Sequence, residues 1–334
     1  MNLLIIGGTA YFGTDIVELA LEAGHKATIC SRGNTRPPFW DHVSHIAADR
    51  TDPQAFGKAL KGKSFDAVID NIAYTAEDVG NALDVFKGNI GRYILTTSAV
   101  VYMNAETFDQ PFNEAQADLE TIIATDSTDP WMEGLVKYAN NKVAAEKLLS
   151  SQSDVPYTIL RPPFVAGPED RLGFARFYCQ RLLDGKPLIL TNGGSQPFQP
   201  VYRRDLAKAF ILALGNDRAV NQAYNIAQES VCSLADWVKL VAQCLDVDPS
   251  LVNVPDKELQ AADFKYAEPF TDNTVTVDIS KAQTQLGFQP TPLDTWTETT
   301  CNWYQNSKYI DDAPGYADRD KEVDLAHRYL MKQS

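Results

Sequence analysis

The sequence predicts an α/β fold in which a doubly wound parallel sheet is followed by a smaller, mixed segment. In the first half of the chain, short apolar stretches of strand length alternate with helical stretches. The apolar stretches do not alternate with polar residues, which is typical of strands buried on both faces. The 334 residues, 44% of them hydrophobic, are enough for one large or two modest domains.

The alternation is regular over the first half of the chain. Right-handed crossovers between parallel strands place the intervening helices on both faces of one sheet. The expected strands are Leu3–Ile6, Lys26–Cys30, Val43–Ala47, Ala67–Asp70, Tyr93–Thr97 and Tyr157–Leu160, and the expected helices are Thr14–Ala23, Pro53–Leu60, Ala76–Lys87 and a stretch from about Gly134 to Ser151.

The pattern changes after Arg161. Proline and glycine cluster at Pro162-Pro163 and Asn192-Gly193-Gly194, and short strands are interleaved with helices. We expect helices at Phe174–Leu183, Asp205–Leu214 and Leu234–Leu245, and strands at Leu188–Leu190, Gln222–Ile226 and Thr274–Val277.

The first strand leads directly into Gly7-Gly8-Thr9-Ala10-Tyr11-Phe12-Gly13 and then into a helix. A strand, a tight glycine turn and a helix N-terminus form the phosphate-binding element of dinucleotide-binding sheets. Gly7 permits the turn and Gly13 permits close packing of helix on strand, whereas the middle position of the fingerprint is Ala10 instead of glycine. We therefore expect residues 7 and 9–13 to contact a dinucleotide; a plain glycine-rich turn is the alternative.

These elements predict the domain organisation. Residues 1–165 would form a dinucleotide-binding domain of the Rossmann type, to which a strand and a helix near 199–227 return. Residues 166–308 would form a smaller mixed substrate-binding segment. Residues 309–334 would form a polar C-terminal tail with an amphipathic helix over Asp318–Met331.

The residues at the end of the second strand indicate whether NAD or NADP is bound. NAD-binding units usually place an acidic residue here to bind the ribose 2′-hydroxyl, whereas an arginine accommodates the 2′-phosphate of NADP. This chain has Ser31 and Arg32 and no acidic residue at the strand end. The sequence therefore favours NADP, with Ser31 and Arg32 as contacts. NAD is the alternative cofactor, and a solvated loop cation is the alternative role for Arg32.

Tyr138 and Lys142 lie four residues apart in an expected helix, so both side chains lie on one helical face. A nearby positive charge favours the phenolate, which suits the pair to proton transfer. The same spacing occurs by chance on solvated helices. Ser98 strengthens the functional interpretation because it follows a central strand, at the edge where such sheets bind ligands.

Composition argues against several classes of protein. No apolar stretch approaches the roughly 20 residues needed to span a bilayer, and the first strand begins without a basic leader or cleavage site. The net charge of −14 weighs against nucleic-acid binding, which depends on neutralising phosphates. The 5 cysteines and 4 histidines show no ligand spacing, so we expect no metal and no disulfide framework. We expect a cytoplasmic protein with a small-molecule substrate and no membrane partner.

In order, the motifs resemble the extended short-chain dehydrogenase/reductase family, whose members are similar to NAD-dependent epimerases and dehydratases. The resemblance covers about residues 1–305. GGTxxxG, the Asp49-Arg50 pair and FQPVYRRDLA resemble one branch, which contains the chloroplast stem-loop-binding proteins and bacterial relatives. The motifs are GGTAYFG at 7–13, TTSAVVY at 96–102, YANNK at 138–142, RPPFVAGP at 161–168, RRDLAKAF at 203–210 and DISKAQTQLGFQP at 278–290.

The resemblance implies roles for individual residues. Ser98 would hold the substrate oxygen and Tyr138 would be the general acid/base. Lys142 would lower the pKa of the tyrosine and bind the nicotinamide ribose. Dimers are common in the family, so a homodimer is an expected assembly. Further cofactor contacts implied by the resemblance are Asp49 at the adenine with Arg50 beside it, Ala73 in the cofactor cleft, and Pro162, Phe164 and Val165 in a loop along the nicotinamide; plain structural roles are the alternative for these.

Three functions follow from the resemblance. The first is an NADP(H)-dependent oxidoreductase acting on a carbonyl or alcohol. The second is a nucleotide-sugar epimerase with tightly bound NAD, which the sequence favours less because Phe198 stands where such epimerases carry a diphosphate-binding arginine. The third is a non-catalytic or RNA-associated protein of the stem-loop-binding type. Dehydration is not expected, because Ala99-Val100 follows Ser98 where dehydratases carry an Asp-Glu pair.

Overall fold

The structure is a computed structural model that describes residues 1–105, 107, 109–124, 128–170, 172–269, 275–307 and 313–333. The chain separates into two compact units, each formed by several segments. The first unit contains Met1–Pro163, Arg203–Ala227 and Val277–Pro290, and the second contains Phe164–Tyr202, Gln228–Thr276 and Thr291–Ser334. This division differs from the expected boundaries in two ways: a third segment returns to the first unit, and the C-terminal residues belong to the second.

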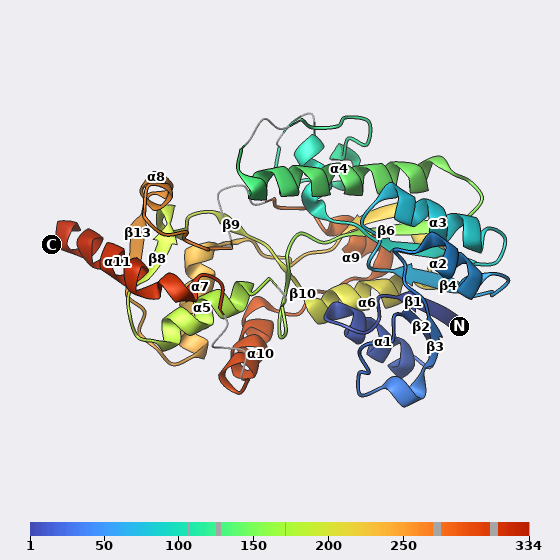
Figure 1. Cartoon of the computed structure of the whole chain (residues 1–334), viewed down its shortest axis with the longest axis horizontal. Coiled ribbons are helices and arrows are strands. Elements are labelled where there is room, and N and C mark those ends of the chain that lie inside the picture. Colours follow the sequence, from blue (N-terminus) through green and yellow to red (C-terminus); the bar gives the residue numbers. More distant parts are fainter. Residues whose placement is uncertain are drawn as a thin grey trace. The chain divides into compact units, whose positions relative to one another are not determined.

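A parallel sheet forms the centre of the first unit (Figure 1). Among the described residues it has seven strands in the order β11-β6-β5-β4-β1-β2-β3, and the predicted doubly wound parallel sheet is therefore confirmed. The order reverses between β1 and β4, and sheets of this type bind ligands at the carboxyl ends of the strands beside such a point. The strands are β1 (Asn2–Ile6), β2 (Lys26–Ser31), β3 (Ser44–Ala47), β4 (Ala67–Asp70), β5 (Tyr93–Thr96), β6 (Tyr157–Arg161) and β11 (Gln222–Asn225).

Helices cover both faces of this sheet. Leu4 and Ile6 of β1 belong to a core cluster with side chains of the helices on one face, and Leu3 and Ile5 point the other way and are equally buried. This two-sided burial explains why the strands lack polar alternation. The helices are α2 (Pro53–Leu60), α3 (Ala76–Phe86) and α4 (Pro130–Ser151) on one face, and α1 (Phe12–Glu22) and α6 (Arg203–Ala213), which pack together, on the other, with α9 (Ser280–Leu286) beside α6.

The helix that carries Tyr138 begins one turn earlier than Gly134, where we expected it. Asp129 caps it, because its side chain accepts a hydrogen bond from the backbone N–H of Trp131. Pro130 occupies the first helical position, where a missing N–H costs nothing. The Asp-Pro pair was thus the start signal, and the apolar spacing alone had not revealed it.

The second unit packs helices around an aromatic core. The ring of Trp237 is stacked on Phe198, with 4.5 Å between centroids, and is edge-on to Tyr178 at 5.5 Å. The buried indole N–H of Trp237 donates to Thr297 Oγ1 at 3.2 Å, so its polar group is satisfied. The elements are α5 (Phe174–Leu183), α7 (Leu234–Cys244), α8 (Asp256–Gln260), α10 (Leu293–Gln305) and α11 (Arg319–Gln333), with β7 (Val165–Ala166), β8 (Leu188–Thr191), β9 (Pro197–Phe198), β10 (Val201–Tyr202), β12 (Cys232–Ser233) and β13 (Leu251–Val254).

Two expectations involve residues outside the described ranges. The expected strand Thr274–Val277 begins there, and its last residue, Val277, forms an isolated bridge to Phe112 within the first unit. Residues 309–312 of the expected tail also lie outside the described residues. The tail helix expected over Asp318–Met331 corresponds to α11. No described helix is long and apolar enough to cross a membrane.

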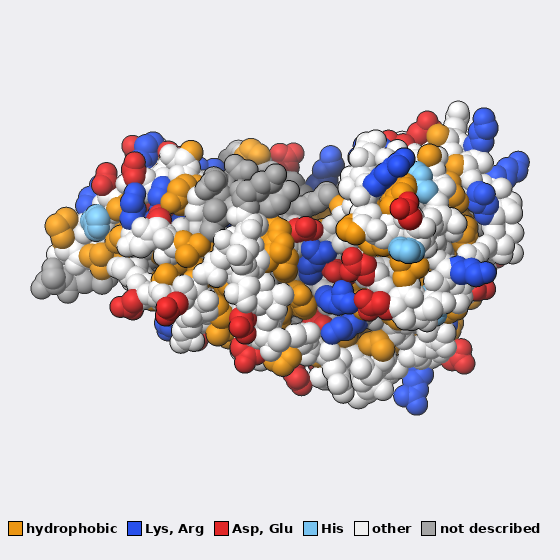
Figure 2. Space-filling view, turned by 90° about the horizontal axis from the view of Figure 1, so that it is seen from below, with side chains coloured by type: hydrophobic (Ala, Val, Ile, Leu, Met, Phe, Trp, Pro, Cys, Tyr) orange, Lys and Arg blue, Asp and Glu red, His pale blue; other side chains and the backbone are white. Residues whose placement is uncertain are grey.

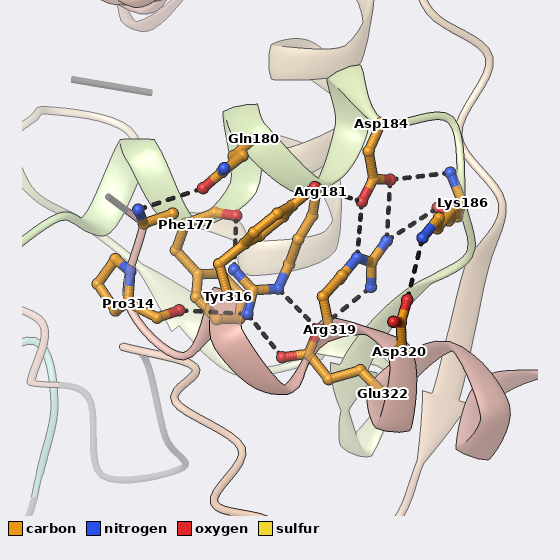
Figure 3. A network of polar contacts seen from close by, with 11 residues as sticks. Phe177, Gln180, Arg181, Asp184, Lys186, Pro314, Tyr316, Arg319, Asp320 and Glu322 are labelled. Carbon is orange, nitrogen blue, oxygen red and sulfur yellow. Dashed lines mark hydrogen bonds and ion pairs between the residues drawn. The ribbon is translucent and has the colours of Figure 1, made fainter. Parts of the chain in front are cut away.

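Buried ion pairs join α11 to α5 within the second unit (Figure 3). Arg181 donates to Glu322 through Nη2 at 2.6 Å and Nε at 2.9 Å, and both side chains are fully buried. Arg319 lies beside them and pairs with Asp184 at 2.8 Å and with Glu322 at 3.1 Å. Two arginines and two carboxylates thus neutralise one another, and the Arg181–Glu322 pair at the centre is shielded from water. The same helix covers the β8–β13 pair with Leu325 and other apolar side chains.

We predict that Glu322→Gln strongly destabilises the chain, because it leaves the buried Arg181 guanidinium without its carboxylate. Removing one partner of a buried pair costs about 3–5 kcal/mol of unfolding free energy. Urea unfolding measures this loss. Asp320→Asn is the matched control, because Asp320 pairs with Lys186 at 3.3 Å on the surface and should leave the urea midpoint unchanged. An equal effect of both substitutions would contradict the prediction.

Candidate active site

The glycine turn between β1 and α1 has no room for side chains at two positions. Gly7 has a φ of +90°, and a Cβ there would lie 2.0 Å from Asn71 Oδ1. A Cβ on Gly13 would lie 2.1 Å from the carbonyl oxygen of Gly7. The turn therefore requires glycine at both places. It brings the N-terminus of α1, with its free N–H groups, to the carboxyl edge of the sheet.

Asn71, which follows β4, connects its own loop to the glycine turn. Its Nδ2 donates to the carbonyl oxygen of Gly7 at 3.0 Å. Its Oδ1 is buried and has no hydrogen-bond partner among the described residues. A buried acceptor without a donor is rare in folded chains, and here it lies beside a donor-rich helix end. Both features fit a nicotinamide dinucleotide, and the half-buried residues Thr9 to Phe12 complete the turn.

Three predicted contacts gather at the ends of β2 and β3. The Ser31 hydroxyl is 3.0 Å from His45 Nε2 and accepts from the Gly33 N–H at 3.3 Å. Arg32 is exposed beside it. Hydrogen bonds from Thr51 lower the pKa of Asp49, and the positive charge of Arg32 lowers it further. Ser31, Arg32 and Asp49 are therefore near neighbours, as a site for the adenosine half of a dinucleotide requires.

Arg50 has a structural environment. Its Nη1 contacts both carboxylate oxygens of Asp70 at 2.6 Å, and its Nη2 donates to the carbonyl oxygen of Asp78 at 2.7 Å. The Tyr93 hydroxyl donates to the same Asp70 carboxylate at 2.5 Å. The guanidinium is buried and held by these acceptors. This arrangement favours the structural alternative over the expected cofactor contact.

The expected catalytic residues meet at the carboxyl edge of the sheet. Ser98 lies two residues after the end of β5 and caps the 3-10 helix η2 (Ala99–Asn104). The Val100 N–H of this helix donates to the Ser98 hydroxyl at 3.2 Å. Ser98 lies close enough to Tyr138 to lower the pKa of the phenol. Lys142 Nζ lies 5.6 Å from the centroid of the Tyr138 ring. Ser98, which is distant in sequence, thus forms one cluster with Tyr138 and Lys142, which lie one helical turn apart on α4.

Lys142 is buried between carbonyl groups. Its Nζ donates to the carbonyl oxygen of Ala73 at 2.7 Å and to that of Thr96 at 3.2 Å. Burial lowers the pKa of Lys142 to about 8, while the carboxylates of Asp70 and Glu146 act in the opposite direction. Ala73, expected to line the cofactor cleft, therefore also positions this lysine.

One expectation about the cluster is corrected by the structure. We expected Lys142 to lower the pKa of Tyr138, but burial raises the pKa of Tyr138 to about 12. The hydrogen bond with Ser98 acts in the lowering direction and is outweighed. The cause of the raised pKa is burial of the phenol, while the Lys142 ammonium faces the Tyr138 ring and donates to backbone carbonyls. Sequence spacing placed both side chains on one helical face but did not decide where the ammonium points.

The expected nicotinamide loop crosses from one unit to the other. Pro162 belongs to the first unit, and its carbonyl oxygen accepts from the Ala99 N–H at 2.8 Å, next to Ser98. Phe164 and Val165 belong to the second unit, where the Phe164 carbonyl oxygen accepts from the Val201 N–H at 2.7 Å. Pro162 thus lies beside Ser98. The roles of Phe164 and Val165 stay a prediction.

Comparison with known proteins identifies the family. The profile of the NAD dependent epimerase/dehydratase family matches residues 3–227. The chain belongs to this family. Members bind NAD or NADP and act on small molecules, so membership supports an enzyme. Among the described residues, no group of His, Cys, Asp or Glu side chains is placed to hold a metal ion.

The proteins similar to this chain include a stem-loop binding protein, a reductase and an epimerase. The chloroplast stem-loop binding protein of 41 kDa b from Arabidopsis thaliana is 27% identical over 303 residues, which cover 86% of this chain and 75% of that protein. The 2′-dehydrokanamycin reductase of Streptomyces kanamyceticus is 22% identical over 258 residues, covering 76% and 70%. The UDP-glucose 4-epimerase of Thermotoga maritima, solved with UDP-glucose, superposes with a TM-score of 0.71 at 17% identity, covering 91% of this chain and 99% of that one. The last likeness shows the shared fold.

Several residues at the site were not expected from the sequence. Tyr74 lies with its ring centroid 4.9 Å from Lys142 Nζ, and its electrostatic influence raises the pKa of Tyr138. Asn71 connects β4 to the glycine turn, and Asp70 holds Arg50. All three belong to the stretch DNIAY, which begins with the last residue of the buried strand β4, and a polar residue at a sheet edge was the available signal.

We predict that Lys142 makes the free energy of unfolding rise with pH. Its pKa is about 8 in the folded chain and near 10.5 when unfolded, so between these values the unfolded chain binds a proton that the folded chain lacks. Urea unfolding at several pH values should show the wild type gaining stability relative to Lys142→Met over this window. Lys147→Met is the control, because Lys147 pairs with Glu120 on the surface. A pH-independent difference for Lys142→Met would refute the burial effect.

Proposed function

We propose that the chain is an NADP(H)-dependent oxidoreductase that acts on a carbonyl or alcohol, with Tyr138 as general acid and base. The observation that carries this proposal is the placement of the Tyr138 phenol beside Ser98 and beside the buried ammonium of Lys142. Hydroxyl, phenol and ammonium groups at the carboxyl edge of a doubly wound sheet are suited to proton transfer at a substrate oxygen.

The protonation state of Tyr138 favours the direction of reduction. A phenol with a pKa of about 12 is protonated at neutral pH and can donate its proton to a carbonyl oxygen. Ser98 lies beside the phenol and would supply a second polar contact for the same substrate oxygen. In the reverse direction the phenolate would remove the alcohol proton, so oxidation should improve as the pH rises.

A bound nicotinamide dinucleotide supplies or accepts the hydride. The chain would hold it with groups that are already positioned. The N-terminus of α1 would bind the pyrophosphate. Ser31 and Arg32 would bind a 2′-phosphate, because the serine presents a hydroxyl and the arginine is free of the buried ion-pair networks. Asp49, Ala73 and Pro162 would complete the contacts.

The substrate class is narrowed by Phe198. This residue stands where nucleotide-sugar epimerases carry a diphosphate-binding arginine, and its side chain is buried against Trp237 in the second unit. An apolar ring in a packed core cannot bind a diphosphate. Ala99 likewise replaces the first residue of the Asp-Glu pair of dehydratases. We therefore propose a carbonyl substrate without a diphosphate.

We predict that Tyr138→Phe lowers kcat for NADPH-dependent reduction by about 10²–10⁴-fold, because the proton donor is lost. The assay follows NADPH absorbance with a panel of small aldehydes and ketones. The Kd for NADPH should stay unchanged. Tyr157→Phe is the control, since Tyr157 begins β6 at the opposite end of the strands. Full turnover by Tyr138→Phe would refute the proposed mechanism.

Cofactor choice is tested by Arg32→Ala. Losing a charge-assisted contact with a phosphate costs about 1.5–3 kcal/mol, or about 10–150-fold in affinity. We expect that loss for NADPH and no change for NADH, measured by fluorescence titration. Equal effects on both would argue against Arg32 as the 2′-phosphate contact.

The two alternatives are less well supported. A nucleotide-sugar epimerase would retain NAD through purification, and native mass spectrometry would detect it. The stem-loop-binding function is supported by motifs that resemble that branch and by the similarity to the chloroplast stem-loop binding protein. The net charge of −14 weighs against it, because such binding depends on neutralising phosphates.

A further inference from the structure

Arg203, at the start of α6, contacts the residues that join the glycine turn to α1. It is the first residue of α6 and is buried. Its Nε lies 2.5 Å from Asp15 Oδ2, and its Nη2 donates to the Tyr11 carbonyl oxygen at 2.8 Å and to Thr14 Oγ1 at 2.9 Å. Its guanidinium carbon also lies 5.2 Å from the centroid of the Tyr11 ring. One side chain thus contacts three residues of the helix start that follows the turn.

Tyr11 has an unusual backbone conformation. Its φ of 51° and ψ of −137° lie in a region that residues with side chains rarely adopt. Such a conformation persists only where its surroundings impose it. The Tyr11 carbonyl oxygen accepts from Thr14 N at 3.0 Å and from Thr14 Oγ1 at 2.6 Å, as well as from Arg203. Arg203 supplies a contact from outside the turn and its helix.

We infer that Arg203 is a positioning residue for dinucleotide binding: it holds the Tyr11 peptide so that the N-terminus of α1 faces the pyrophosphate. The inference rests on the proposed dinucleotide-binding function. Arg203 acts through the turn, because the bonds described above point at Tyr11, Thr14 and Asp15. Arg203 directly follows β10, which ends at Tyr202, and is therefore distant in sequence from the turn. We infer that this distant residue helps to determine the shape of the phosphate-binding turn.

Charge adds to the effect of geometry. Asp15 lies in the first turn of α1, where its carboxylate would repel a pyrophosphate. The ion pair with Arg203 neutralises that carboxylate. Removal of the guanidinium would therefore loosen the Tyr11 peptide and also release a negative charge beside the phosphates.

Arg204 provides a matched control. Its Nη2 lies 3.1 Å from Glu22 Oε1 and its Nη1 lies 3.5 Å from Glu18 Oε2, along the side of α1. Its Nη1 also lies 4.0 Å from Asp15 Oδ1, much farther than the 2.5 Å contact of Arg203 with that carboxylate. Figure 2 shows basic and acidic side chains interleaved on the face of the first unit that carries α1 and α6. Arg203 and Arg204 are therefore adjacent arginines on one helix, and only Arg203 bonds to Tyr11 in the described contacts.

The experiment compares Arg203→Met, Arg204→Met and the double variant Arg203→Met with Tyr11→Gly. The Kd for NADPH and for NADH is measured by fluorescence titration. We expect Arg203→Met to weaken both cofactors by the same factor, about tenfold or more, which corresponds to one charge-assisted hydrogen bond. Arg204→Met should leave both values within twofold. Tyr11→Gly should restore part of the affinity, because glycine adopts the turn conformation without support.

Three results would overturn the inference: unchanged affinity in Arg203→Met, a loss confined to NADPH, or no recovery in the double variant. Hydrogen exchange of residues 11–14 without cofactor is the second measurement, and it should be faster in Arg203→Met and unchanged in Arg204→Met. Equal exchange in both would overturn the positioning role even if the wild type binds neither cofactor. Failure of the wild type to bind either would instead refute the proposed function. Thermal unfolding confirms that each variant is folded.

Discussion

The buried carboxylate of Asp70 is the interaction on which the carboxyl edge of the sheet depends. It ends β4 without exposure to solvent, so it must be compensated. Arg50 contacts both of its oxygens, the Tyr93 hydroxyl donates to one, and the Ile72 N–H donates to the other. These bonds join β4, β5 and the segment after β3. They also set the path of the loop that follows, whose side chains and carbonyls form the site.

That loop connects the two chemical parts of the site. Asn71 bonds to Gly7 and so reaches the phosphate-binding turn, while the Ala73 carbonyl oxygen holds Lys142. Asp70 also influences Lys142 through its negative charge. A second buried group, in which Glu146 binds Arg161 and the Thr97 hydroxyl, supports the same lysine from its own helix. Two buried ion pairs, Arg50–Asp70 and Arg161–Glu146, therefore support the cluster of Ser98, Tyr138 and Lys142.

The structure changes how the catalytic cluster is understood. The one-face placement of Tyr138 and Lys142 is a property of helix spacing and follows from the sequence. The protonation of Tyr138 follows from its burial, which outweighs the lowering effect of Ser98 on the pKa. Neither effect can be seen in the spacing. A protonated phenol beside a lysine of lowered pKa fits a proton donor in reduction better than a preformed base. The family name alone does not distinguish these two roles.

The sequence by itself determined the order and type of the main elements, because apolar periodicity, the glycine turn and the motif order are local patterns. It also predicted the family, through motifs that span most of the chain. Tertiary structure decided which polar groups are buried and what they contact. Arg50 is the clearest case: its sequence position beside Asp49 pointed to a cofactor, whereas its side chain binds Asp70 in the core. Arg203 shows the opposite case: the sequence did not point to it as a site residue, but its side chain contacts Tyr11, which is far away in the chain. Such contacts depend on how α6 packs on α1, and no local pattern encodes that packing.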